Sequence, residues 1–340
     1  MVKWWLLSGV ILIFIQVFIG GVTRLTGSGL SITKWDIVLG TFPPVNEEKW
    51  KKEFELYKAT PQYQRLNQGM ALDEFKFIYF WEYFHRLWAR IMGLIFVIPF
   101  VFILFRGGYP KWLILRLFVM LLWAILVAAF GWLMVASGLK ERPWVNAYNL
   151  TFHLCLAMGL MGYIYWTYLK YVEASRFNSS IVLRRLIILF FVIVCWQIFL
   201  GGIMSGMHAA LSYPSWPSMN GQFIPEVLGN LKNWSVENFL ISDQHSFMAS
   251  FIQFFHRMSG YSLLLLLIYI NYKVVKESGR LPREVVVLDM LLIIQIILGI
   301  SVLLNSAGTI PIWLGVWHQS VGMIVFLGSL ILVYKSLNKA

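Results

Sequence analysis

Residues 81–105, WEYFHRLWARIMGLIFVIPFVFILF, decide the fold class of this chain. The ionisable residues of this stretch all lie in its first ten positions, and the remainder is apolar. A helix that crosses a bilayer needs about 20 predominantly apolar residues. The stretch is therefore predicted to be a membrane-spanning helix whose ionisable groups gather near one end.

Seven further stretches of similar character occur along the 340 residues. The eight predicted spans are residues 4–22, 81–105, 112–137, 147–170, 183–205, 247–272, 284–305 and 312–335. The composition agrees, because 59% of the residues are hydrophobic and only 13% are charged, against about 25% charged in soluble domains. This excludes a cytoplasmic globular enzyme, a disordered protein and a nucleic-acid binder. We expect an all-α integral membrane protein surrounded by lipid.

The positions of lysine and arginine predict the orientation in the membrane. With the N-terminus inside, fourteen of these cations lie on the inner side, and the short outer loops carry only Lys140, Arg142 and Lys232. Positive residues accumulate in cytoplasmic loops, so both termini are predicted to be cytoplasmic. The bacterial inner membrane is the plainest localisation.

The two halves of the chain resemble each other. FIGGVTRLTG (18–27) aligns with FLGGIMSGMH (199–208), and EYFHRLWARIMG (82–93) aligns with QFFHRMSGYSLL (253–264). Four spans per half give both halves the same entry side, so the repeat is of the parallel kind. We expect two pseudo-symmetric four-helix bundles.

The predicted halves are residues 1–175 and 176–340. Each half begins with one span followed by a long outer loop, at 23–75 and 206–246. Trp35 and Trp216 occupy matching places in these loops and are interpreted most simply as interface anchors, with contact to a ligand edge as the alternative.

Four of the six histidines lie in the even-numbered spans, which all run from outside to inside: His85, His153, His256 and His318. Each follows the predicted start of its span by a few residues, so at about 1.5 Å rise per residue all four are expected in the outer half of the membrane. His208 and His245 fall in an outer loop and are expected to be solvated or capping side chains.

Intramembrane histidines need a partner because burying an ionisable group in a bilayer is unfavourable. Two opposed imidazoles ligate haem iron, and a four-helix bundle has room for a macrocycle between facing helices. The pairing predicts one haem-sized site at His85 with His153 and another at His256 with His318. Zinc is the weaker interpretation, since no carboxylate or thiolate cluster accompanies the histidines.

One ionisable residue distinguishes the two halves. Glu82 stands three residues before His85, on the same helix face, and the matching residue is the neutral Gln253. Glu82 is either a functional acid or an interface residue paired with Arg86. Arg86 and Arg257, which follow the histidines directly, either bind haem propionates or reach toward the membrane interface.

Five motifs carry a resemblance along nearly the whole chain. They are FIGGVTRLTGSGLSI (18–32), GMALDEFKFIYFWEYFHRLWARIMG (69–93), TFHL (151–154), FFHRMSGY (254–261) and WHQSVG (317–322). Together they resemble the haem A synthase family, in particular the subgroup of alphaproteobacteria and mitochondria. Another subgroup carries a cysteine pair in its outer loops, which this chain lacks, so no thiol-based step is carried over.

The resemblance implies oxidation of the C8 methyl of haem O to a formyl group by two hydroxylations with water-derived oxygen, giving haem A for cytochrome oxidase. By position, His256 and His318 would ligate a resident haem b. His85 and His153, with Arg86, would frame the haem O site, and Glu82 would be the functional acid. The sites would lie toward the periplasm, and a haem O synthase and an unidentified electron acceptor would be partners.

The residues alone leave two other classes open. A di-haem b-type electron-transfer cytochrome linked to quinone needs only the four histidines. A transporter built from parallel repeats would use them as a proton relay and would bind no haem.

Overall fold

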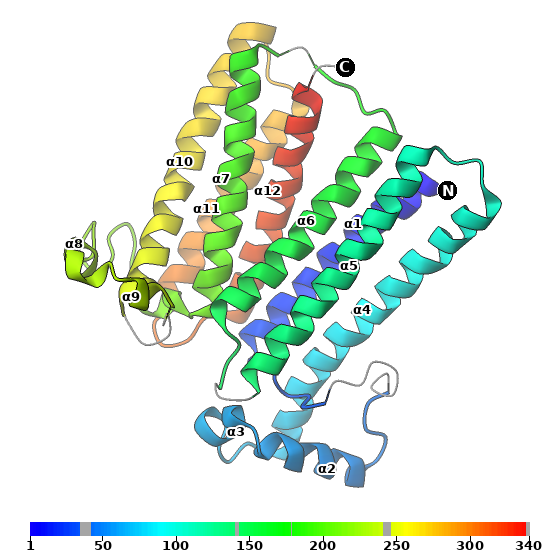
Figure 1. Ribbon diagram of the computed structural model, residues 1–340. Helices are drawn as coiled ribbons and strands as arrows, with labels where there is room; N and C mark the ends of the chain where they lie inside the picture. The colour runs from blue at the N-terminus through cyan, green and yellow to red at the C-terminus, as the bar shows by residue number, and fades with distance from the viewer. Residues whose placement is uncertain (35–41, 140–142, 178, 241–245, 338–340) are drawn as a thin grey trace. The chain divides into compact units, whose positions relative to one another are not determined.

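The computed structural model describes residues 1–34, 42–139, 143–177, 179–240 and 246–337 (Figure 1). Within these ranges the regular structure is helical, and one isolated bridge joins Met219 and Gln222. The eight helices long and apolar enough to cross a membrane are α1 (Val2–Leu25), α4 (Leu72–Arg106), α5 (Lys111–Gly138), α6 (Ala147–Tyr171), α7 (Ile181–Gly206), α10 (Ser246–Ser278), α11 (Arg283–Leu304) and α12 (Ile312–Ser336). The prediction of an all-α, multi-pass membrane protein is confirmed.

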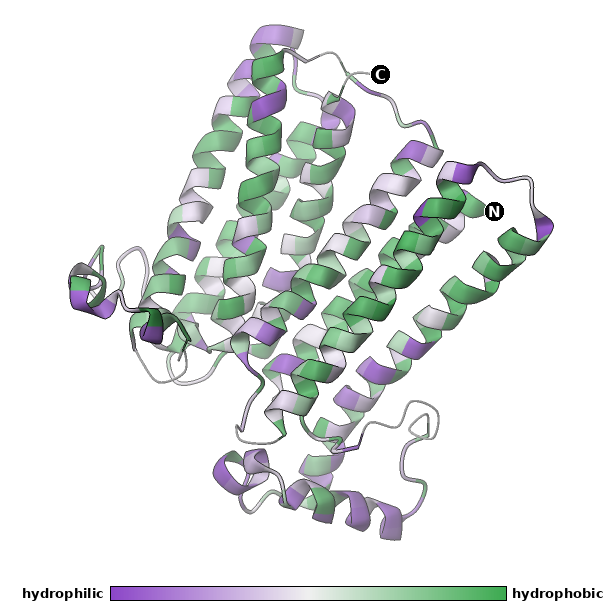
Figure 2. Ribbon diagram, viewed as in Figure 1, coloured by the Kyte–Doolittle hydropathy of each residue, from purple (hydrophilic) through white to green (hydrophobic). Residues whose placement is uncertain are grey.

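The hydropathy of these segments explains why they form long helices. Figure 2 shows long hydrophobic stretches in the membrane-spanning helices, interrupted in α4, α6 and α10 by hydrophilic or neutral residues. A bilayer offers no water to unpaired backbone groups, so a helix that satisfies them internally is the stable form of such segments. Gly107, which follows α4, has a φ of 65°, a conformation that glycine adopts without steric cost and that ends the helix.

Most of the helix bounds lie within three residues of the predicted spans, but two helices extend much further. α4 begins at Leu72 rather than at residue 81, and α10 continues to Ser278 rather than ending at 272. An apolar window marks only the part of a helix that suits hydrocarbon. Capping groups and packing outside the apolar window decide where each helix begins and ends.

The chain divides into two compact units. The first unit is Ser8–Met161, and the second unit is Met1–Leu7 with Gly162–Ala340. In the second unit α7 packs against α10 and α12, and α11 packs against α12 (Figure 1). The division at 175/176 and the pseudo-symmetry between halves stay predictions.

Short helices occupy the long loops that follow α1 and α7. In the first unit they are α2 (Glu47–Lys58) and α3 (Pro61–Leu66), and in the second unit η2 (Ala209–Leu211), α8 (Glu226–Gly229), η3 (Leu231–Asn233) and α9 (Val236–Leu240). Asn46 and Thr60 cap α2 and α3 by accepting backbone N–H groups, which satisfies donors that a helix start leaves open.

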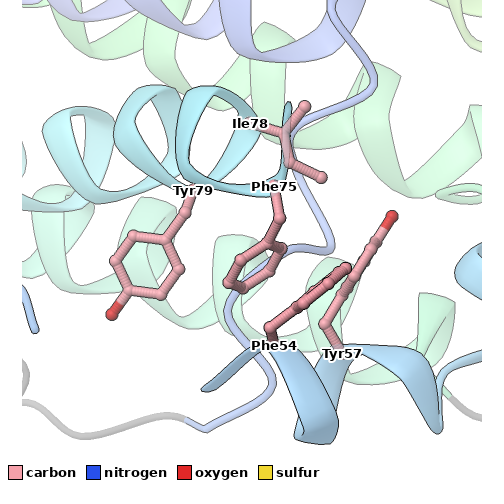
Figure 3. Packing of buried hydrophobic residues seen from close by; sticks show 5 residues of the cluster. All are labelled: Phe54, Tyr57, Phe75, Ile78 and Tyr79. Carbon is pink, nitrogen blue, oxygen red and sulfur yellow. The ribbon is translucent and has the colours of Figure 1, made fainter. Parts of the chain in front are cut away.

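An aromatic cluster holds α2 against the beginning of α4. Figure 3 shows its members: Phe54, Tyr57, Phe75, Ile78 and Tyr79, all buried. The ring of Phe75 stacks on Phe54 and Tyr57, with centroids 4.9 and 5.1 Å apart. This packing accounts for the extra turns of α4, because an aromatic face that is covered on one side stabilises a helix beyond its membrane span.

A hydrogen-bond chain ties the cluster to the end of α1. The Tyr57 hydroxyl donates to Gln62 Oε1 at 3.1 Å and accepts from Asn67 Nδ2 at 2.7 Å. Gln62 Nε2 donates to the carbonyl oxygen of Gly27 at 2.9 Å. Burial raises the pKa of Tyr57, so this phenol is a neutral donor well beyond neutral pH.

Candidate functional site

His85, on α4, is held by two residues of α1. The Nε2 atom of Gln16 lies 3.1 Å from His85 Nε2 and 3.3 Å from Nδ1, and it donates to the His85 carbonyl oxygen at 3.1 Å. A Cβ added to Gly20 would lie 3.0 Å from His85 Cε1. The absence of a side chain at Gly20 is therefore what lets the imidazole approach α1.

His153, on α6, is placed in a similar way by α5. Its Nδ1 lies 3.1 Å from the carbonyl oxygen of Val127, and a Cβ on Gly131 would be 3.0 Å from its Cε1. With a proton on Nδ1 donated to this carbonyl, Nε2 keeps the lone pair that binds a metal.

In the second unit, α7 supports His256 of α10. Gln197 Nε2 donates to the His256 carbonyl oxygen at 3.0 Å, and a Cβ on Gly201 would lie 3.4 Å from His256 Cε1. The Gln197 side chain also accepts a hydrogen bond from the hydroxyl of Ser259. The glutamine thus links the two helices next to the imidazole.

α11 supports His318 of α12 through the same residue types. Gln295 Nε2 lies 3.4 Å from His318 Nε2, and a Cβ on Gly299 would lie 2.9 Å from His318 Cε1. All four predicted histidines therefore pack on a glycine of the preceding long helix, and none of the four is exposed.

A glutamine precedes the glycine by four residues in three of these supports: Gln16 and Gly20, Gln197 and Gly201, Gln295 and Gly299. In the fourth support Val127 takes the glutamine's place. These contacts of the histidines with glutamine and glycine were not predicted from the sequence, although the recurring Gln-x-x-x-Gly spacing in three odd-numbered spans was a signal for them.

The histidine pair of the second unit fits a haem iron. The ring centroids of His256 and His318 are 6.4 Å apart, and their planes are inclined by 67°. An imidazole nitrogen lies about 2 Å from a bound metal and roughly 1 Å from its own ring centre, so two rings on opposite sides of one iron are centred about 6 Å apart. Both Nδ1 atoms are buried without a hydrogen-bond partner among the described residues.

Glu82 is buried and fully engaged. Its Oε1 accepts from Arg86 Nη2 at 2.5 Å, and its Oε2 accepts from Ser31 Oγ and from the Ile32 backbone N–H, both at 2.8 Å. The side chain is only 4% exposed. A carboxylate accepts hydrogen bonds without donating any, and this set of donors provides for both of its oxygens. The Glu82–Arg86 pair allowed by the spacing is present together with these contacts.

Arg86 extends from Glu82 toward a small pocket. Its Nη1 donates to the Lys34 carbonyl oxygen at 3.0 Å and its Nη2 to that of Ile32 at 3.2 Å. Arg86, Lys34 and Trp132 line a pocket of about 100 Å³ in the first unit. The pocket is large enough for a carboxylate-sized group and too small for a macrocycle.

The second unit has a different arrangement at the matching positions. Gln253 Nε2 donates to the Tyr213 carbonyl oxygen at 3.1 Å. Arg257 donates to backbone carbonyl oxygens of the loop that follows α7, including those of Tyr213 at 3.1 Å and Ser215 at 2.9 Å. Within the described ranges, Arg257 forms no ion pair with a carboxylate.

The other candidate residues named above make none of these contacts or lie outside the described ranges. Trp35 and His245 fall outside the described residues. The Trp216 indole N–H donates to the Tyr261 hydroxyl at 3.0 Å. Across the described ranges no three His, Cys, Asp or Glu side chains converge as a metal-ion site.

Comparison with known proteins gives a consistent result. Residues 3–330 match the model of the COX15-CtaA family, described as cytochrome oxidase assembly protein. A relative named Heme A synthase from Bradyrhizobium diazoefficiens is 38% identical over 330 residues, which are 95% of this chain and 88% of the relative. Relatives with the same name from Flavobacterium psychrophilum (36% identical, 94% of each chain) and Parvibaculum lavamentivorans (38%, 96% of this chain and 91% of the relative) are also similar.

Proposed function

The chain belongs to the COX15-CtaA family of cytochrome oxidase assembly proteins, and from this premise we propose that it is a haem A synthase. Its substrate is haem O, and its product is haem A for cytochrome oxidase. The near-complete match to relatives named Heme A synthase favours this function over an electron-transfer cytochrome or a transporter. The observation in the structure that carries it is the His256–His318 pair at a spacing suited to haem iron.

The proposed reaction converts the C8 methyl of haem O into a formyl group. Each of two hydroxylations takes oxygen from water and releases two electrons and two protons, and the resulting geminal diol loses water. The electrons require an acceptor, which we propose to be a separate redox partner. The protein's part is to orient the porphyrin, to supply a fixed charge and to limit water.

The two units divide the work. His256 and His318 would hold a resident haem b, which would supply electron-transfer capacity. His85 and His153 frame the haem O site, and the carbonyl of Val127 fixes the tautomer of His153 by accepting its Nδ1–H. The ionisable Glu82 of the first unit is matched by the neutral Gln253 in the second, which supports placing the chemistry in the first unit.

Glu82 is the proposed catalytic acid. Its hydrogen bonds to Arg86, Ser31 and the Ile32 backbone hold a negative charge in a fixed place one helical turn from His85. A preorganised charge stabilises positive character that develops at an oxidised methyl and orients a water molecule there. Arg86 is the proposed partner of a haem O propionate through the pocket that it lines.

We further propose the bacterial inner membrane as the location, with cytoplasmic termini and both sites toward the periplasm. The distribution of lysine and arginine supports this orientation. Haem O synthase is the proposed supplier of substrate, because the product of that enzyme is this enzyme's substrate.

The test is co-expression with a haem O synthase in a host that lacks its own haem A synthase, followed by chromatography of the extracted haems. Haem A is the expected product. Purified protein that holds two b-type haems without forming haem A would indicate an electron-transfer cytochrome. Protein without Soret absorption would indicate a transporter.

A further inference from the structure

An arginine follows the first histidine of each pair, and its surroundings differ between the units by one charge. In the first unit Arg86 contacts the carboxylate of Glu82 at 2.5 Å. In the second unit Arg257 has the amide of Gln253 beside it, and both side chains donate to the same Tyr213 carbonyl oxygen. Arg257 therefore attracts an external anion more strongly than Arg86 does.

Among the described residues of the second unit, no carboxylate pairs with Arg257. Its guanidinium donates to carbonyl oxygens at 2.9 to 3.4 Å, including those of Pro217 and Ser218. Its Nε atom and Gln253 Oε1 are buried without hydrogen-bond partners in the described part of the chain. Carbonyl dipoles orient a guanidinium but leave its net charge, and a partly buried uncompensated charge favours binding of an anion.

The first unit already contains its anion. The Glu82 and Arg86 side chains are 4% and 12% exposed, so water screens their attraction weakly. An external carboxylate that approaches Arg86 must share this cation with Glu82. The local charge of the pair is zero before any ligand binds.

We propose that Glu82 keeps the porphyrin of the first unit exchangeable by neutralising Arg86, whereas Gln253 leaves the charge of Arg257 to retain the porphyrin of the second unit. The inference rests on the proposed function, in which both porphyrins carry propionates. A substrate site must release product in every turnover, and a resident cofactor must stay. The single difference between Glu82 and Gln253 at matching positions accounts for both the release of product and the retention of the cofactor. In this role Glu82 acts through Arg86 as a positioning residue.

The experiment measures haem release from the full-length protein in detergent. Wild-type protein, Glu82→Gln and Gln253→Glu are loaded with haem b and mixed with excess apomyoglobin, and haem transfer is followed in the Soret region. A kinetic phase of haem transfer that is absent in His85→Ala is assigned to haem bound in the first unit. Asp73→Asn is the matched control, since it removes one exposed carboxylate from the same helix, where it pairs with Lys76.

Glu82→Gln is expected to slow release from the first unit by about tenfold, and Gln253→Glu to accelerate release from the second unit by a similar factor. Glu82→Asp, which keeps the charge, should release haem faster than Glu82→Gln, and Asp73→Asn should match the wild type. Unchanged release in both Glu82→Gln and Gln253→Glu, or faster release in Glu82→Gln, overturns the proposal.

The outcomes separate this inference from the proposed function. If the protein forms haem A but its haem release rates are unchanged by both substitutions, the exchange role of Glu82 is contradicted and the proposed function is not. Protein whose release rates respond as expected but that forms no haem A contradicts the synthase assignment and leaves the charge argument intact.

Discussion

His256 and His318 face each other in the second unit with ring centroids 6.4 Å apart. This separation leaves room for one iron between two imidazole nitrogens. Their Nδ1 atoms have no hydrogen-bond partner among the described residues, and Gln295 Nε2 lies 3.4 Å from His318 Nε2. Both imidazoles would be needed to hold a haem iron between them.

The first prediction is that His256→Ala and His318→Ala each lose the resident haem, while His85→Ala retains it and loses haem A formation. The measurement is haem per polypeptide by pyridine haemochrome, with haem A analysed separately. His208→Ala, in the segment after α7, is the control and should keep both the resident haem and haem A formation. Full resident haem in both second-unit variants would reverse the assignment of the units.

The second prediction concerns the glycines behind these rings. A Cβ on Gly299 would lie 2.9 Å from His318 Cε1, and a Cβ on Gly201 would lie 3.4 Å from His256 Cε1. Gly299→Ala must therefore displace the His318 ring, at a cost of about 1–3 kcal/mol for overpacking, and it should lower haem content and shift the Soret band. Gly201→Ala should do less.

Gly260→Ala is the matched control for these glycines. A Cβ there would meet only the flexible end of Gln197, at 3.7 Å, so the variant should bind haem as the wild type does. An unaltered spectrum in Gly299→Ala would show that the close glycine contact does not position His318.

The third prediction is that Gln16→Leu lowers haem A formation by about 10- to 100-fold while leaving the resident haem intact. The reason is that Gln16 contacts both the ring and the carbonyl oxygen of His85, and residues that orient a ligand histidine have effects of this size. The split between resident haem and product is the measurement. Equal losses of both would indicate a general folding defect instead.

The fourth prediction concerns the short helices α2 and α3. Tyr57→Phe removes one donor and one acceptor from the chain that joins Asn67, Gln62 and Gly27, and it should lower the free energy of unfolding by about 1–2 kcal/mol. Thermal unfolding in detergent measures this. Tyr63→Phe is the control, because the Tyr63 hydroxyl forms no hydrogen bond among the described residues.

The same tyrosine has a predicted pH dependence. Burial raises the pKa of Tyr57 above its unfolded value, so its stabilising contribution is complete below pH about 10 and is lost as the pH rises through the higher folded value. The wild type should therefore lose more stability than Tyr57→Phe on going to strongly alkaline pH. Parallel pH profiles for the two proteins would contradict this interpretation.

The spans and the histidines could be predicted because each depends on local sequence alone. Apolar length marks a membrane helix, and four histidines in even-numbered spans stand out in so apolar a chain. The glycine supports depend on how two helices are rotated toward each other, as with Gly131 and His153, and no single segment encodes that rotation.

The extra length of α4 escaped prediction for a related reason. Residues 72–80 are less apolar than a span requires, and they are helical because α2 covers Phe75 and Ile78. The starts of α2 and α3, in the loop after α1, did have local signals, namely Asn46 before two glutamates and Thr60 before Pro61. These signals show that a helix begins without showing what it packs against.

The fifth prediction is that Glu82→Ala lowers haem A formation by about 100-fold or more, the size expected for loss of a positioned acid or base. Gln253→Ala, at the matching position of the second unit, should retain most of the product. The measurement is the ratio of haem A to haem O in extracted haems, with the resident haem spectrum as a check on folding. A normal haem A yield in Glu82→Ala would remove Glu82 from the mechanism.

A double variant separates two ways in which Glu82 can act. If Glu82 serves only to neutralise Arg86, removing the arginine as well should restore product formation, because no unpaired charge remains. If the carboxylate itself stabilises charge or orients water at the oxidised methyl, Glu82→Ala with Arg86→Ala should stay as inactive as Glu82→Ala. Since the carboxylate also accepts from Ser31 and Ile32, independently of the arginine, it keeps its place without Arg86, and we expect the second outcome.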